Sequence, residues 1–179
     1  MSGHNKWTQI KHKKAATDQK RAIVFSKLLR AISVSAQQES NPQFNPTLRN
    51  AIAKAKEYAV PLENIDRAVK KSQETKYISE LLIEAYGPEG VALLITAFTD
   101  NKNRTIAEIK NIISDHHGKW ADPGSVLWAF EKQEGEWSAK FPQTLSPATQ
   151  EHLISLIDAL DDHPDVSDVY TNTQPLTPE

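Results

Sequence analysis

The stretch SELLIEAYGPEGVALLITAFT, residues 79–99, decides the fold class of this chain. Its two halves, 79–86 and 91–99, are rich in Leu, Ile, Val and Ala and short enough to be strands. Between them lies Gly87-Pro88-Glu89-Gly90, a combination of residues typical of a turn. The stretch therefore predicts two strands joined by a turn, so this part of the chain contains a β-sheet.

Downstream of this stretch, helix and strand patterns alternate. Thr105-Ile106-Ala107-Glu108 has the spacing of a capping box, which predicts a helix beginning at Thr105, and Gly118 is a plausible C-terminal cap. Ser146-Pro147 predicts the start of another helix. Alternating apolar residues predict strands over 126–131, 137–141 and 166–171. From residue 91 the order is β-α-β-β-α-β, the ferredoxin-like arrangement, with 79–86 expected as an extra edge strand.

Upstream, the apolar residues recur at helical spacing. Residues 22–36 carry them three and four positions apart, and Lys20, Lys27 and Arg30 lie opposite that apolar stripe on a helical wheel. Asn45-Pro46 predicts the cap and first residue of a second helix. Pro61 ends it, and a third helix follows. The sequence thus predicts an α+β protein: a helical module over residues 1–76, then an acidic α/β domain over 77–179.

Charge divides the chain in the same way. Residues 1–76 carry 15 Lys or Arg and 6 Asp or Glu, a net charge of +9, while the remainder carries a net −11. Such an asymmetry points to a polyanion as the partner of the basic part. An adaptor whose basic half binds an acidic protein is the alternative that charge alone leaves open.

Several function classes are excluded or disfavoured. The chain has no cysteine, so disulfides and thiolate metal sites are absent. The longest apolar run, near 91–98, is too short for a membrane helix, and no secretory signal is visible. No phosphate-binding glycine loop or nucleophile elbow is present. We expect a cytoplasmic protein that is not an enzyme and needs no cofactor; the sequence does not fix its oligomeric state.

Two clusters could carry chemistry, and neither predicts a site. His116-His117 are adjacent at the end of a predicted helix, where neighbouring side chains diverge by about 100°, a poor arrangement for binding one metal ion. The second cluster is acidic, and a paired-carboxylate catalytic site is conceivable there. A solvated acidic surface is the better interpretation, because no other catalytic residue type accompanies it. Its members are Asp158, Asp161, Asp162, Asp165 and Asp168.

The sharper signal is an interleaving of cations with apolar residues in the first 14 positions. The lysines there attract phosphates, while Trp7 either stacks on an unpaired base or packs on the helices. Near the helix predicted at Thr105, Lys102 and Arg104 form either an anion pocket or an ordinary capped helix start. The predicted nucleic-acid-binding residues are Lys6, Trp7, Lys11, His12, Lys13, Lys14, Lys20, Arg21, Lys27, Arg30, Arg67, Lys70, Lys71, Lys102 and Arg104.

Ordered motifs lie at residues 3–7, 10–16, 64–68, 86–92, 99–105, 124–126 and 156–160. Together they resemble the YebC/PmpR family, which includes the mitochondrial translational activator of cytochrome oxidase subunit I. The resemblance implies a non-enzymatic regulator: members are described as DNA-binding transcriptional regulators, and some act in translation at the ribosome. Whether DNA or ribosomal RNA is the target stays open, although cations spread over several helices favour sequence-tolerant phosphate binding.

Two departures from the family pattern stand out. Family members usually carry a further α/β domain between the strands corresponding to 125–132 and 136–141, whereas here a short turn around Gly135 joins them. This predicts a simple β-hairpin. The second departure is Glu89, at a position where the family pattern usually has glycine, which indicates either less need for backbone freedom or a different turn.

Overall fold

The computed structural model describes residues 18–72, 78–133 and 136–174 of the 179-residue chain. Its first part is the predicted set of three helices. Asn45 caps the second of them, its side chain accepting a hydrogen bond from the Leu48 amide at 3.0 Å, and Pro46 follows at the first helical position. The helices pack around Ile32, Leu48 and Ile65. They are α2 (Asp18–Ala36), α3 (Pro46–Glu57) and α4 (Leu62–Lys71).

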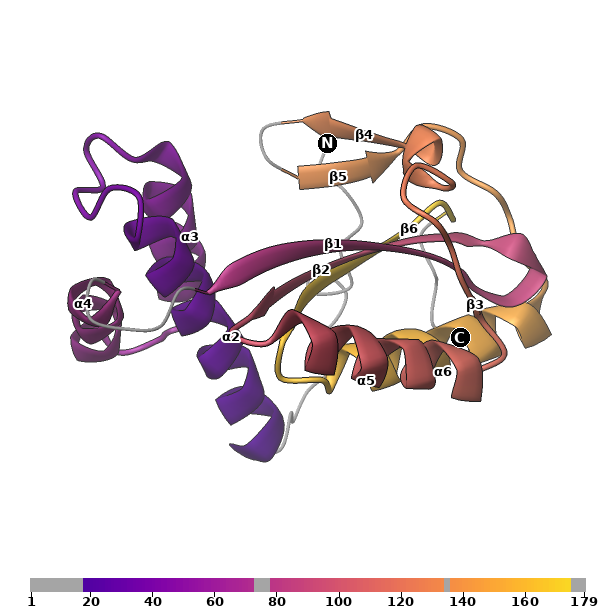
Figure 1. Cartoon of the computed structure of the whole chain (residues 1–179), viewed down its shortest axis with the longest axis horizontal. Coiled ribbons are helices and arrows are strands. Elements are labelled where there is room, and N and C mark those ends of the chain that lie inside the picture. The colour runs from indigo at the N-terminus through magenta and orange to yellow at the C-terminus, as the bar shows by residue number, and fades with distance from the viewer. Residues whose placement is uncertain (1–17, 73–77, 134–135, 175–179) are drawn as a thin grey trace.

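The second part is a four-stranded antiparallel sheet with the strand order β3-β1-β2-β6. Helices α5 and α6 cover one face of this sheet, and the β4–β5 hairpin lies over the other (Figure 1). The short helix η1 makes the turn between β1 and β2, and η2 precedes the hairpin. The elements are β1 (Ser79–Tyr86), η1 (Pro88–Gly90), β2 (Ala92–Thr99), α5 (Lys102–Asp115), β3 (Lys119–Trp120), η2 (Leu127–Ala129), β4 (Phe130–Gln133), β5 (Glu136–Ala139), α6 (Pro147–Asp161) and β6 (Val166–Thr171).

The predicted α+β class is confirmed, but strands of the α/β part lie elsewhere than expected. Strand β1 is central, between β2 and β3, whereas an edge position was expected. Strands β4 and β5 form a two-stranded sheet of their own, and β4 begins only at Phe130. The late start of β4 is explained by Glu84 on β1. This buried carboxylate accepts backbone hydrogen bonds from Gly124, Val126 and Leu127. These bonds fold residues 124–129 into a loop and a short helix.

Both ends of α5 also differ from expectation. The helix begins at Lys102 and is capped by Asn101, whose side chain accepts from the Arg104 amide. Thr105 lies one turn further in, fully buried, because its hydroxyl binds other buried groups. At the other end His117 takes the left-handed conformation, with φ 59°. Gly118 is required for a different reason: a Cβ there would lie 2.8 Å from Ile113 Cγ2.

The two departures from the family pattern have clear structural outcomes. Gln133 pairs with Glu136, so β4 and β5 form the predicted simple hairpin. Glu89 adopts φ 54°, so the position does require the left-handed conformation that glycine accepts most easily. The Glu89 carboxylate accepts a 2.6 Å hydrogen bond from the Thr149 hydroxyl, which ties the turn to the start of α6.

Candidate nucleic-acid interface

The exposed cations of the helical module lie on all three of its helices. Arg67, Lys70 and Lys71 are exposed on α4 at spacings of three and four residues, so they share one face of that helix. Arg21 is exposed on α2, with its guanidinium 5.3 Å from the centre of the Phe25 ring. The same face of α4 also carries two exposed acids, Glu63 and Asp66, each one turn before a cation, so its cations gather toward the C-terminal end of α4.

Helix α3 adds cations that the sequence-based list of binding residues missed. Arg49 and Lys56 are both exposed on this helix. Both residues contribute to the positive charge of residues 1–76, but neither lies in the amino-terminal cluster of cations or in a predicted motif. The amino-terminal candidates Lys6, Trp7, Lys11, His12, Lys13 and Lys14, and the side chain of Lys20, lie outside the described residues, so their roles stay predictions.

Lys27 is not where the helical wheel placed it. Its side chain is buried, with 6% of the residue exposed, and donates a hydrogen bond to the main-chain oxygen of Asp161 at the end of α6. Burial lowers the pKa of the Lys27 ammonium, against the opposing charge of Asp161. The helical wheel predicted an exposed Lys27, and this prediction is wrong because α2 is packed on two sides. Its apolar stripe contacts α3 and α4, and its polar face contacts the α/β region.

Arg30, one turn further along α2, also points into the α/β region. Its guanidinium forms an ion pair with the Asp165 carboxylate and donates to the main-chain oxygens of Phe98 and Pro164, each at 3.2 Å. The side chain is 35% exposed, so part of it still reaches the surface. Arg30 therefore joins the two parts of the structure instead of lying on an open basic face.

Asp165 is the centre of this contact. It is 3% exposed, and its carboxylate accepts from the Thr105 hydroxyl at 2.6 Å, from Arg104 at 2.7 Å and from Arg30. Burial by itself would raise the pKa of Asp165, but the hydrogen bonds from Thr105, Arg104 and Arg30 outweigh it and hold the pKa below 3.8. The expectation that the acidic cluster is a solvated surface is wrong for this residue.

The other members of the acidic cluster differ in how far they are exposed. Asp168 on β6 pairs with Lys54 of α3 at 3.4 Å, so a second helix of the module is tied to the same region. Asp158 and Asp162 are exposed. The opposite charges of the two halves therefore meet in the structure, where Asp165 and Asp168 pair with Arg30 and Lys54.

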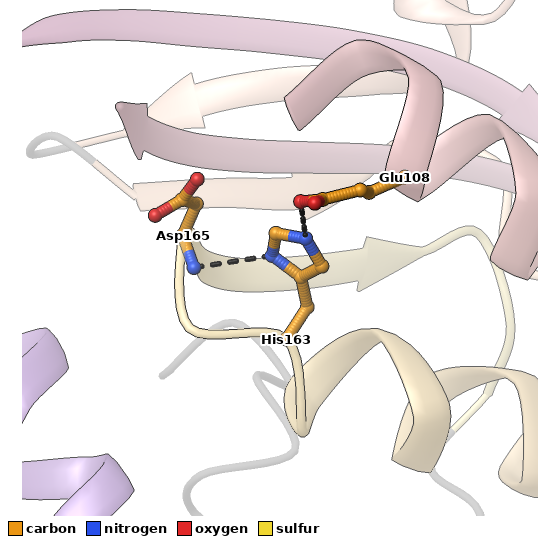
Figure 2. A group of neighbouring side chains, drawn as sticks. All are labelled: Glu108, His163 and Asp165. Carbon is orange, nitrogen blue, oxygen red and sulfur yellow. Dashed lines mark hydrogen bonds and ion pairs between the residues drawn. The ribbon is translucent and has the colours of Figure 1, made fainter. Parts of the chain in front are cut away.

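Glu108, His163 and Asp165 come together beside this contact (Figure 2). Their ligand atoms lie within 4.8 Å of one another, close enough for a metal ion. His163 Nδ1 accepts from the Asp165 amide at 3.1 Å, so the ring proton lies on Nε2 and is donated to Glu108 at 2.9 Å. Both Asp165 carboxylate oxygens already accept from Arg30 or from Arg104 and Thr105, and two adjacent guanidinium groups disfavour a cation. The donor set fits a hydrogen-bond network better than a metal site.

The start of α5 carries the remaining candidates, Lys102 and Arg104. Arg104 contacts three acids, Asp165 at 2.7 Å, Asp100 at 3.4 Å and Glu108 at 3.8 Å, and hydrogen bonding to Asp165 raises the pKa of the guanidinium. These acids balance its charge, so an anion pocket at this position stays a prediction that now depends on exposed Lys102.

Comparisons with known proteins agree with this architecture. The family model "TACO1/YebC protein N-terminal domain" matches residues 5–75, and "TACO1/YebC second and third domain" matches residues 78–135. The crystal structure of a conserved hypothetical protein, Aq1575, from Aquifex aeolicus superposes with a TM-score of 0.82 at 30% identity, covering 94% of this chain and 96% of that one. In the parts that the structure describes, no helix is long and apolar enough to cross a membrane.

Sequence relatives are named "Probable transcriptional regulatory protein". One from Fervidobacterium nodosum is 48% identical over 137 residues, which is 74% of this chain and 54% of the relative. The chain thus spans about half the length of relatives such as this one. A second relative, from Desulfosudis oleivorans, is 37% identical over 236 aligned positions. That alignment covers 96% of this chain and 96% of the relative. That alignment is longer than the 179 residues here, so the relative carries positions that this chain lacks. On the strength of these matches, the chain belongs to the TACO1/YebC family.

Proposed function

We propose that this protein is a non-enzymatic regulator of gene expression that binds the phosphate backbone of nucleic acid through exposed cations of its helical module, residues 1–76. The transcriptional role in the names of its relatives supports the regulatory part of the proposal. The module's net charge of +9 supports the choice of a polyanion. Its place of action is then the cytoplasm, where transcription and translation offer such targets.

The observation that carries the proposal is the group of three exposed cations in the C-terminal half of α4. Arg67, Lys70 and Lys71 lie at helical spacing on one exposed surface. Phosphates along a nucleic-acid strand recur every few ångströms, so a helix face with several cations can contact more than one. Arg49 and Lys56 of α3 extend the set of exposed cations.

Recognition by such a surface is tolerant of sequence. Contacts from Lys and Arg to phosphates position a protein on nucleic acid, whereas base edges are distinguished by side chains that enter a groove. The exposed cations are spread over helices α2, α3 and α4 instead of being concentrated on one recognition helix. Duplex DNA and structured RNA are both suitable ligands, with Trp7 as a proposed stacking contact for unpaired bases.

The salt dependence of binding tests this proposal. We compare the full chain with a variant carrying Arg67→Gln, Lys70→Gln and Lys71→Gln, using fluorescence anisotropy with a random-sequence DNA duplex and a structured RNA. If each side chain neutralises one phosphate, the log–log slope of affinity against salt should become shallower by about 2.7 on the duplex. A matched control removes three exposed lysines of the α/β region, Lys110, Lys119 and Lys140.

The two variants should separate clearly. The control should keep the wild-type slope, and both should keep the wild-type melting temperature, because exposed substitutions shift stability little. An α4 variant with the wild-type slope would remove this helix from the binding surface. Failure of both DNA and RNA to bind at 50 mM salt would instead favour the adaptor alternative, in which the basic module binds an acidic protein.

A further inference from the structure

An acidic segment of the α/β region holds cations of the helical module. This acidic segment, residues 161–168, comprises the end of α6, the following loop and the start of β6. Lys27 donates to the Asp161 main-chain oxygen, Arg30 pairs with Asp165, and Lys54 pairs with Asp168 at 3.4 Å. These contacts bring eight consecutive positions near the C-terminal end of the described chain onto two helices near its start.

We propose that the acidic segment is an intramolecular competitor of nucleic acid: its carboxylates occupy Arg30 and Lys54 until a polyanion displaces them. The inference rests on the proposed function, because it assumes that the helical module binds phosphates. It goes further in assigning two cations, and the acids that hold them, to a closed and an open state of the same binding surface.

The three cations held by the acidic segment differ in exposure, and their exposure shows which contacts can open. One contact is fixed and two can be released. Lys27 is buried and hydrogen-bonded to main chain, so it stays in place when solvent or ligand changes. Arg30 and Lys54 have side chains 35% and 37% exposed, so a phosphate can approach them from solvent. The Lys54–Asp168 pair is partly exposed on both sides and is screened by salt, so exchanging Asp168 for a phosphate costs little. The Arg30–Asp165 pair costs more to open, because the Asp165 side chain is only 2% exposed.

Asp165 can release Arg30 without becoming an unpaired buried charge. Its carboxylate keeps the hydrogen bonds from Arg104 and the Thr105 hydroxyl, both of which come from α5 in the same part of the structure. A buried carboxylate with no remaining donor would make opening very costly. Asp168 likewise keeps a 2.7 Å hydrogen bond from Ser167 when Lys54 leaves. The acids are therefore built to remain stable in both states.

The test uses Asp168→Asn, which releases Lys54 and leaves the buried Asp165 untouched. With the same duplex and the full chain, the variant should bind more tightly than wild type at low salt, with a log–log slope steeper by about 0.9, one additional phosphate contact. A fourfold rise in salt should then cost the variant about 3.5-fold more affinity than it costs wild type. Asp115→Asn is the matched control: it removes the same charge from an exposed site at the far end of α5 and should leave the slope unchanged.

A second substitution identifies the released group. Adding Lys54→Gln to Asp168→Asn should return the slope to the wild-type value, whereas Lys54→Gln alone should leave the wild-type slope unchanged. Equal slopes for Asp168→Asn and Asp115→Asn, or a wild-type slope that Lys54→Gln reduces, would overturn the inference while leaving the proposed function intact. Absence of binding by every variant would instead refute the proposed function, and the inference with it.

Discussion

Replacing Asp165 by Asn tests the contact that joins the helical module to the α/β region. The substitution keeps the size of the side chain but removes the charge that Arg30 and Arg104 share. Removing one partner of a buried ion pair costs about 3–5 kcal/mol. Here the two arginine side chains are 35% and 46% exposed and can regain hydration, so we expect a loss of about 2–3 kcal/mol in the free energy of unfolding at pH 7.

The loss of unfolding free energy caused by Asp165→Asn should also depend on pH. The pKa of Asp165 is lower in the folded than in the unfolded chain, so its stabilisation is complete above the unfolded value, near 4, and disappears as the pH falls through the folded value. Urea unfolding followed by circular dichroism should show a constant gap between wild type and variant from pH 7 to pH 5. Below about pH 4 the gap should narrow.

Asp115→Asn provides the control, because it removes an exposed carboxylate and should change stability by less than about 0.5 kcal/mol. A loss for Asp165→Asn no larger than that of the control would show that the contact contributes nothing to stability. A gap that widens as the pH falls below 4 would show that the sign of the pKa shift is wrong.

Four further substitutions at three positions test local features by thermal unfolding of each variant against wild type. Gly118→Ala should destabilise by about 1–3 kcal/mol, because its Cβ would lie 2.8 Å from Ile113 Cγ2 and 2.9 Å from the Tyr86 oxygen; an unchanged melting temperature would contradict this packing. Asn45→Ala should cost about 0.5–2 kcal/mol through loss of the α3 cap. Asn45→Asp should keep the cap but still destabilise, because a carboxylate cannot donate the hydrogen bonds that the Asn45 amide gives to the main-chain oxygens of Ser35 and Glu39. Glu84→Gln should cost about 1–3 kcal/mol, since an amide cannot accept as many backbone hydrogen bonds as a carboxylate; a neutral effect would show that the Gly124 loop does not depend on it.

The parts of the fold that sequence predicts well are those fixed by nearby residues. Asn45 and Pro46 specify a helix start by themselves, and the turn within residues 79–99 joins two strands that pair directly with each other. The simple hairpin of β4 and β5 has the same local origin.

The parts that sequence missed depend on distant partners. Thr105 has the spacing of a capping residue, yet Asp165, 60 positions away, draws its hydroxyl into the interior, and Asn101 caps the helix instead. The position of β1 at the centre of the sheet depends on β3, a strand of two residues that no periodicity could reveal.

The candidate binding residues also fall into two groups, those whose exposure depends on nearby residues and those whose position depends on distant ones. The exposure of Arg67 and Lys70 follows from the helical spacing of α4, which sequence supplies. The burial of Lys27 and the pairing of Arg30 depend on the acidic segment, more than 130 positions away. The opposite charges of the two halves were visible, but nothing in the sequence showed that they face each other.

The most direct test of the central claim is the affinity of the full chain for nucleic acid as a function of salt. Fluorescence anisotropy between 50 and 200 mM salt, with unrelated duplexes and a structured RNA, measures both the strength of binding and its electrostatic part. The account predicts binding to all of these ligands, with similar affinities and a log–log slope on the duplexes of at least about 2.7 in magnitude, from the three cations of α4. Binding that is independent of salt, or confined to one sequence, would contradict it.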